Sequence, residues 1–282
     1  MFEKTNQDQN VGDGAIAVQA ARDVNIGMSF TEVRELCQLF LQNNFPALRA
    51  EAKAVAEEHV RLFSEKLEQR IVDAAAQIDP NKFRDPDVQA CLNDAVLAAA
   101  RRGDAANPDV LCTLVTERIS AQASSFKDIV LSEAVQVVPK LTAQHISLLC
   151  LTFLVQSVSF AGVMRLSDLE QAAQLVKPLV GSCAGLSLAQ KQHVQYAGAC
   201  AYLNITMTDP YQSIWKTYER FGHADIDSFK AELRAVAPTF VEIINSYSNN
   251  QLWCITPTSV GQAIAIASLS TCIAMDFSVW LH

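Results

Sequence analysis

Turn-forming residues are scarce in this chain. Ten glycines and nine prolines occur among its 282 residues, which is about 7% of the chain, where average usage gives roughly 12%. Because few turns imply long elements, the composition argues against β-sandwiches, collagen-like repeats and Pro/Gly-rich disorder. It predicts a mainly α fold with a multi-helix body, and the length allows one large domain or two modest ones.

The charge and the cysteines indicate the setting in which the chain acts. A net charge of −8 argues against a broad face for DNA or RNA, so we expect no nucleic-acid partner. Eight cysteines occur without a CxxC pair, and most stand among apolar neighbours, as buried thiols do. Residues 1–14 are polar and carry no secretion signal, so we expect a reducing, cytoplasmic location.

Two short alternating segments precede the helical body. Within residues 10–27, Ile16 and Val18 form one apolar pair, and Val24 and Ile26 form a second pair eight residues later. A turn between the pairs would place both on one face of a β-hairpin or β-arch. Because a lone hairpin is marginal in water, we expect residues 1–28 to join copies of the chain and residues 29–282 to form the helical body.

Capping residues and hydrophobic periodicity predict the elements of that body. Ser29 begins a helix to about residue 41, and residues 46–78 form an amphipathic helix that packs on this chain or, alternatively, on another subunit. Asp85 and Asn107, each followed by proline, begin the next two helices, and Gly103 ends the first of them. Further helices are expected at about 124–138, 142–161, 167–180, 187–203, 210–221, 225–236, 239–247 and 258–269, with minor strands at 252–255 and 277–281. A tentative sub-boundary near residue 140 separates a charge-rich half from a charge-poor one.

Two stretches, 141–164 and 251–275, contain no charged residue. The first is long enough to span a bilayer. Four polar residues recur along one face of its predicted helix, which a lipid-facing span should not carry. These residues are His145, Thr152, Gln156 and Ser159. A buried helix is the favoured interpretation, and membrane disruption by the two stretches is the alternative.

Cysteine chemistry has two weak candidates. Residues 181–185 read Gly-Ser-Cys-Ala-Gly and fit a G-x-nucleophile-x-G frame, with Cys183 as the nucleophile. The same glycines also suit the end of one helix and a loop before the next. His193 and Cys200 stand seven residues apart on one predicted helix and could form a Cys–His pair, although a core histidine near a buried cysteine is the commoner arrangement. A cysteine-dependent hydrolase therefore stays an alternative.

Metal and cofactor signals are weak. His223, Asp225 and Asp227 lie close together and are the best candidate ligands, but a helix end followed by a new helix cap accounts for them. The sequence contains no GxxxxGK[ST] and no GxGxxG after a strand. We expect no resident metal and no cofactor.

Several short motifs resemble an uncharacterised family of bacterial proteins. The likeness covers most of the chain as scattered segments, and Ala21 replaces a glycine that is usual in the family. Its motifs are Asn10, Gly12, Asp13, Ala17, Gln19, Ala20, residues 23–27, residues 30–35, residues 139–142, Leu252, residues 256–267 and residues 277–280. The resemblance implies a shared fold and a bacterial origin, but it transfers no activity. Similar N-terminal tags resemble those on bacterial conflict and defence proteins.

These observations favour an interaction protein over an enzyme. We expect a homo-oligomeric scaffold or sensor that contacts an unknown protein partner, in bacterial stress or phage defence. The membrane-disrupting effector and the cysteine-dependent hydrolase are the alternatives. The sequence names no ligand, substrate or trigger.

Overall fold

The computed structural model describes residues 31, 34–35, 45–121, 124–203 and 209–281. The chain divides into two compact units, residues 1–54 and residues 55–282. The predicted β segment, with Ile16, Val18, Val24 and Ile26, lies outside the described residues, and so does most of the predicted helix from Ser29 to residue 41. The fold described below is that of the second unit.

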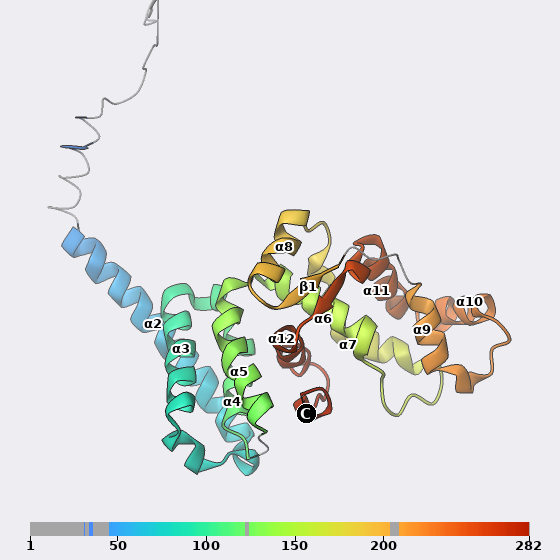
Figure 1. Cartoon of the computed structure of the whole chain (residues 1–282), viewed down its shortest axis with the longest axis horizontal. Helices are drawn as coiled ribbons and strands as arrows, with labels where there is room; N and C mark the ends of the chain where they lie inside the picture. Colours follow the sequence, from blue (N-terminus) through green and yellow to red (C-terminus); the bar gives the residue numbers. More distant parts are fainter. Residues whose placement is uncertain (1–30, 32–33, 36–44, 122–123, 204–208, 282) are drawn as a thin grey trace, which may run out of the picture. The chain divides into compact units, whose positions relative to one another are not determined.

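The described residues form eleven α-helices and one small sheet, which confirms the mainly α fold (Figure 1). The sheet is antiparallel, with Cys200 opposite Pro257. The helices are α2 (Phe45–Asp73), α3 (Pro86–Arg102), α4 (Pro108–Arg118), α5 (Ser125–Val137), α6 (Ala143–Ser157), α7 (Asp168–Val180), α8 (Leu188–Tyr196), α9 (Pro210–Thr217), α10 (Ile226–Val236), α11 (Pro238–Asn249) and α12 (Ser259–Leu269), and the strands are β1 (Cys200–Tyr202) and β2 (Ile255–Pro257).

Local capping explains where most helices begin. The side chains of Asp85 and Asp209 each accept a hydrogen bond from the backbone N–H two residues ahead, with proline at the first helical position. Ser187 forms the predicted capping box with Gln190. Gly103 ends α3 with a φ of 51°, where an added Cβ would meet the ring of His59.

Two predicted caps are made differently. Asn107 does not cap α4 with its side chain, because its amide donates to the carbonyl of Leu141 at 3.3 Å. Ser167 makes no cap at α7 either. Asp168 instead accepts hydrogen bonds from the backbone N–H groups of Met164 and Arg165, both at 2.9 Å. Capping-box spacing therefore located this helix start to within one residue, but the predicted side-chain cap of Ser167 is not formed, and the bonds to Asp168 hold the loop before α7.

The predicted helix at 187–203 is wrong in its second half. α8 ends at Tyr196, Gly198 takes a φ of 89°, and Cys200 begins β1. Three other predicted helices are shorter than expected, since α2 ends at Asp73, α6 at Ser157 and α9 at Thr217. Gly198 and the pairing of β1 with β2 end α8. Neither of these constraints can be inferred from helical periodicity.

Both predicted C-terminal strands also need correction. Residues 252–254 form a 3₁₀ turn, and the strand begins only at Ile255. Residues 277–279 form another 3₁₀ turn, because the side chain of Asp276 accepts a hydrogen bond from the backbone N–H of Ser278. Such local side-chain bonds compete with extended backbone.

Both uncharged stretches supply core helices. α12 packs against α4, α5 and α6, and residues 145–154 of α6 are buried on every face. Gly261 permits this packing, since a Cβ there would lie 1.8 Å from the carbonyl oxygen of Ala199. Gln156, from the predicted polar stripe, donates to the carbonyl of Ile255 at 2.8 Å and so links α6 to β2.

The membrane test gives a separate result. In the part of the chain that the structure describes, no single helix has both the length and the apolar character to cross a bilayer. One pair of segments, Asp168–Cys183 and Leu188–Tyr196, meets those criteria together, but the pair bends by 104°.

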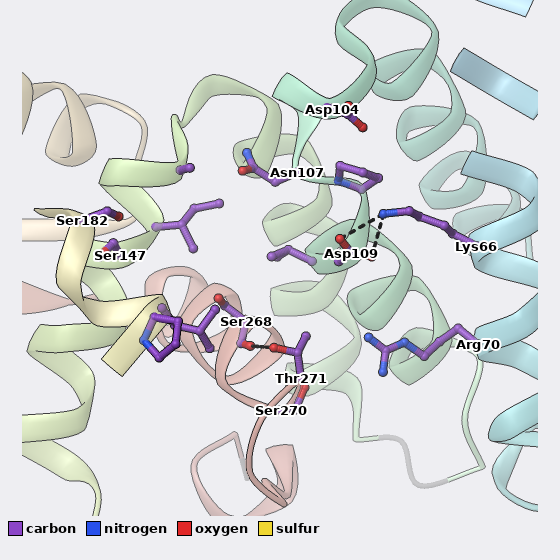
Figure 2. Close-up of a pocket in the computed structure, with 16 residues that line it drawn as sticks. Lys66, Arg70, Asp104, Asn107, Asp109, Ser147, Ser182, Ser268, Ser270 and Thr271 are labelled. Carbon is purple, nitrogen blue, oxygen red and sulfur yellow. Dashed lines mark hydrogen bonds and ion pairs between the residues drawn. The ribbon is translucent and has the colours of Figure 1, made fainter. Parts of the chain in front are cut away.

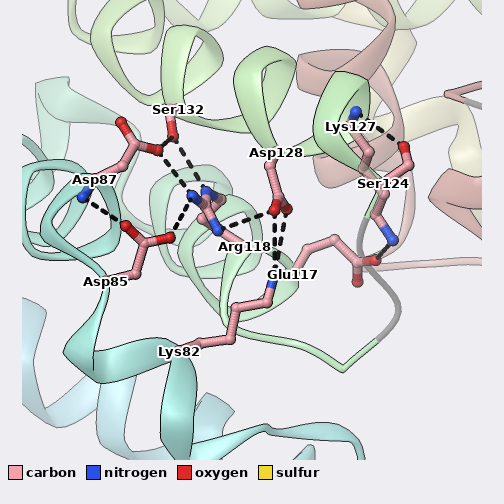
Figure 3. Close-up of polar contacts among 9 residues, drawn as sticks. All are labelled: Lys82, Asp85, Asp87, Glu117, Arg118, Ser124, Lys127, Asp128 and Ser132. Atoms are coloured by element: carbon pink, nitrogen blue, oxygen red, sulfur yellow. Dashed lines mark hydrogen bonds and ion pairs between the residues drawn. The ribbon is translucent and has the colours of Figure 1, made fainter.

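A buried guanidinium joins the helices of the first half of this unit (Figure 3). Arg118, at the end of α4, is only 3% exposed. Its Nη2 lies 2.8 Å from a carboxylate oxygen of Asp87 in α3, and its Nη1 lies 3.4 Å from Asp128 in α5. Its Nε donates to Ser132 at 3.2 Å. The ion pair holds the pKa of Asp87 below its usual value.

Replacing this guanidinium should destabilise the fold. We expect Arg118→Met to lower the free energy of unfolding by about 2–3 kcal/mol, because Asp85, Asp87 and Asp128 lose their buried counter-ion while keeping partial access to water. Arg61→Met is the matched control, since Arg61 forms ion pairs at 53% exposure, where water screens them, and its loss should change the free energy of unfolding much less. Urea denaturation followed by circular dichroism measures both. Equal losses would contradict the assigned role of Arg118.

Candidate functional site

A pocket of about 630 Å³ opens among the ends of several helices (Figure 2). This volume is in the usual range for small-molecule sites. α2 supplies one wall, the start of α4 a second, and α6, the end of α7 and the end of α12 the rest. Its polar lining residues are Lys66, Arg70, Asp104, Asn107, Asp109, Ser147, Ser182, Ser268, Ser270 and Thr271.

The α2 wall brings two cations to the pocket, and their partners differ. Lys66 Nζ lies 2.9 and 3.0 Å from the two carboxylate oxygens of Asp109, so its charge is neutralised. Arg70, about one turn further along the helix, is half-buried and points into the pocket. Its guanidinium makes no hydrogen bond or ion pair to any described residue. A charged fork of five N–H donors is therefore available at this wall.

The end of α12 presents hydroxyl groups with a defined orientation. Ser270 donates its hydroxyl hydrogen to the carbonyl of Ala267 at 2.9 Å, and Thr271 donates to the carbonyl of Ser268 at 2.7 Å. These bonds satisfy the last carbonyls of the helix. Because each hydrogen is engaged, both hydroxyl oxygens offer lone pairs, so they accept hydrogen bonds from a donor in the pocket.

The opposite wall contains the buried hydroxyl group of Ser147, which has no strong hydrogen-bond partner among the described residues. Ser147 of α6 is 2% exposed, and its Oγ makes no hydrogen bond among the described residues. Burial raises the pKa of the neighbouring Cys183 thiol, and the Ser147 hydroxyl offsets only part of that rise, because a thiol is a weak hydrogen-bond partner. An unsatisfied buried hydroxyl costs about 1–3 kcal/mol, so Ser147 favours a bound polar group.

The candidate nucleophiles are buried. Cys183 is 1% exposed in the 3₁₀ turn after α7, its Sγ lies 3.5 Å from the carbonyl of Val180, and burial raises its pKa. Burial raises the pKa of Cys200 to about 11. Cys200 lies on β1 and His193 on α8, so the shared helix face predicted for them does not exist. Residues 181–185 therefore form the end of α7 and the loop before α8, as the simpler interpretation predicts.

Thiol labelling checks this arrangement. We expect iodoacetamide at neutral pH to modify Cys272, which is exposed, well before Cys183 or Cys200, because only the thiolate reacts and burial disfavours it. Peptide mapping by mass spectrometry identifies the modified residue. A Cys272→Ser variant should lose the fast phase at that peptide. Rapid modification of Cys183 in the folded protein would support the hydrolase alternative instead.

His145 has a structural task at the start of α6. Its Nδ1 accepts a hydrogen bond from the backbone N–H of Thr142 at 3.2 Å, while Thr142 Oγ1 accepts from the N–H of His145 at 3.3 Å. This capping box requires the neutral ring with hydrogen on Nε2. The ring of His193 lies 5.4 Å away, and its Nε2 hydrogen-bonds the carbonyl of Lys140 at 2.9 Å. Burial, and secondarily His193, lowers the pKa of His145.

Acid should therefore weaken the fold through His145. A histidine whose pKa is lower in the folded chain gives its full stabilisation above the unfolded pKa of about 6.5, and that stabilisation declines as the pH falls below this value. We expect unfolding free energies at pH 7, 6 and 5 to fall more steeply for the wild type than for His145→Gln. Glutamine keeps the capping box without titrating, so parallel slopes would contradict this role.

The candidate metal ligands have other partners. His223 Nε2 lies 2.7 Å from Glu232, and Asp225 caps α10 through the N–H of Ser228 at 2.7 Å. Asp227 lies in the first turn of the same helix. Within the described ranges, no group of three or more histidine, cysteine or carboxylate side chains is arranged to hold a metal ion. These residues form a helix start, as the simpler interpretation predicts.

Comparison with known proteins places the chain in a family. The model of an uncharacterised protein family matches residues 27–224 and 208–281. The chain belongs to this family. Neither a curated protein nor a solved structure matches it. The pocket residues therefore have to be interpreted from their own chemistry.

Sequence reasoning missed this pocket. Arg70 read as one of many charged residues on an amphipathic helix, and Ser147 as one of many residues in an apolar stretch. The one available signal was the group of hydroxyl residues Ser268, Ser270 and Thr271 at the end of the buried helix α12. Only the fold brings it to Arg70.

Proposed function

We propose that the chain is a non-enzymatic, homo-oligomeric interaction protein that acts as a sensor of a small molecule. The pocket carries this proposal. It has the size of a ligand site, and its lining offers a guanidinium, an ion pair and hydroxyl groups, but neither a thiol nor an imidazole among the described residues. Such groups recognise a ligand by charge and hydrogen bonding, and the thiol–imidazole pair that a cysteine-dependent hydrolase needs is not among them.

The position of α2 suggests how binding could affect assembly. Arg70 lies near the C-terminal end of α2, and the other end of this helix begins at Phe45, on the side of the N-terminal segment. A ligand that draws Arg70 toward the end of α12 favours one position of α2 over others. Differential binding of this kind shifts a conformational equilibrium. We propose that residues 1–28 join the copies of the chain and respond to this shift.

Two alternatives receive less support from the described residues. A membrane-disrupting effector would have to release α6 and α12 from the centre of the core, where both are buried. A cysteine-dependent hydrolase would need a reactive thiol, and burial raises the pKa of Cys183 and Cys200. We therefore retain the interaction role, and we propose bacterial stress or phage defence in the cytoplasm as its setting.

The assembly can be measured on the full chain. We expect light scattering to give the wild type a molar mass of at least a dimer, and Val18→Asp with Ile26→Asp to give a monomer, because buried charges oppose apolar pairing. Val279→Asp is the control, since Val279 is 58% exposed and its change should leave the mass unaltered. A monomeric wild type, or an unaltered mass in the double variant, would refute the proposed role of residues 1–28.

A further inference from the structure

We infer that the ligand of this pocket is a small hydroxylated anion whose carboxylate or phosphate group pairs with Arg70. The inference rests on the proposed binding role of the pocket and adds the chemical class of the ligand. It follows from the charges of the lining, the orientation of the Ser270 and Thr271 hydroxyls, and the buried, unsatisfied hydroxyl of Ser147.

The charges of the pocket leave one cation to be neutralised. Lys66 and Asp109 neutralise each other through two contacts of 2.9 and 3.0 Å. Asp104 and Asn107 lie at another part of the pocket from Arg70 (Figure 2). Arg70 has no ion-pair partner in the part of the chain that the structure describes, and its half-buried position makes water a poorer substitute. A carboxylate or phosphate matches the planar fork of a guanidinium with two parallel hydrogen bonds.

The hydroxyl groups select a ligand that also carries hydrogen-bond donors. Ser270 and Thr271 have given their own hydrogens to the α12 carbonyls, so their oxygens can only accept. Asp104 also accepts only. A simple inorganic anion has few hydrogen-bond donors for these acceptor oxygens at neutral pH. Hydroxyl groups on the ligand would donate to them.

Ser147 is the observation that separates this pocket from an ordinary surface hollow. Its hydroxyl is 2% exposed, lines the pocket and makes no hydrogen bond to a described residue. Buried polar groups are nearly always satisfied in folded proteins. A ligand oxygen that reaches this hydroxyl would satisfy it, which gives the site a polar group at each of two walls, Arg70 on α2 and Ser147 on α6.

Three compounds with the same carbon skeleton test the inference. Glycerol 3-phosphate is glycerol with a phosphate on one hydroxyl. Glycerate has a carboxylate in place of one CH₂OH group, and glycerol itself carries no charge. We expect isothermal titration of the full-length protein to show binding of at least one anion, with glycerol at least about tenfold weaker, because glycerol cannot form the charge-assisted hydrogen bonds with Arg70. The tighter of the two anions identifies the anionic group.

Variants assign the binding to this pocket. Arg70→Met should weaken the tighter anion by about tenfold or more, and Arg70→Lys should weaken it less, because lysine keeps the charge but loses the fork. Ser147→Ala should also weaken it. Arg234→Met is the matched control, since Arg234 is an exposed arginine of α10 outside the pocket lining, and it should bind as the wild type does. Unfolding midpoints verify that each variant is folded.

Three results would overturn the inference: equal binding of glycerol and the anions, an unchanged dissociation constant in Arg70→Met, or no binding of either anion by the wild type. Each is independent of the molar mass measured without added ligand. If the titration shows that the anion inference is wrong, the assembly role can still be tested by light scattering. If the wild type is monomeric, the anion titration can still be interpreted.

Discussion

The buried ion network of Arg118 is the interaction on which the first half of the helical unit depends. A guanidinium with 3% exposure needs counter-charges in fixed places, and Asp85 and Asp87 of the α3 start and Asp128 of α5 supply them. Lys127, 2% exposed and paired with Glu117, repeats the arrangement beside it. These pairs fix α3, α4 and α5 relative to one another. The start of α4, which forms one wall of the pocket, is fixed with them.

The polar character of the pocket follows from the helix ends that meet there. α4 and α6 begin at the pocket, and α7 and α12 end at it. Helix ends leave backbone groups without intrahelical partners, so the residues around them have to be polar. Ser270 and Thr271 satisfy carbonyls at the end of α12, and Asn107 bonds the chain just before α6. Arg70 fits the same pattern, because it lies in the last turn of α2.

The parts of the fold that the sequence predicted correctly depend on local chemistry. Asp85, Ser187 and Asp209 cap their helices through backbone groups two or three residues away, and such signals are readable from spacing alone. The errors occur where distant residues decide. Cys200 leaves its predicted helix to pair with Pro257, 57 residues later. The predicted strand at 277–281 failed for the opposite reason, because a single cap by Asp276 outweighs an apolar pattern of only five residues.

The pocket was not predictable, because none of its groups is unusual within its own segment. Arg70 lies at the end of a charged helix face, as many arginines do near a helix C-terminus. Ser147 lies in an apolar segment, and nothing in that segment indicates that its hydroxyl lacks a hydrogen-bond partner. Their significance comes from what they lack among the described residues, an ion pair for Arg70 and a hydrogen bond for the Ser147 hydroxyl. A sequence pattern can indicate the hydrogen-bond or ion-pair partners that lie nearby in the chain. That a side chain has no partner can be seen only in the folded structure, where the positions of the other side chains are known. A binding site that uses ordinary residues is therefore found by the groups that the fold leaves unsatisfied.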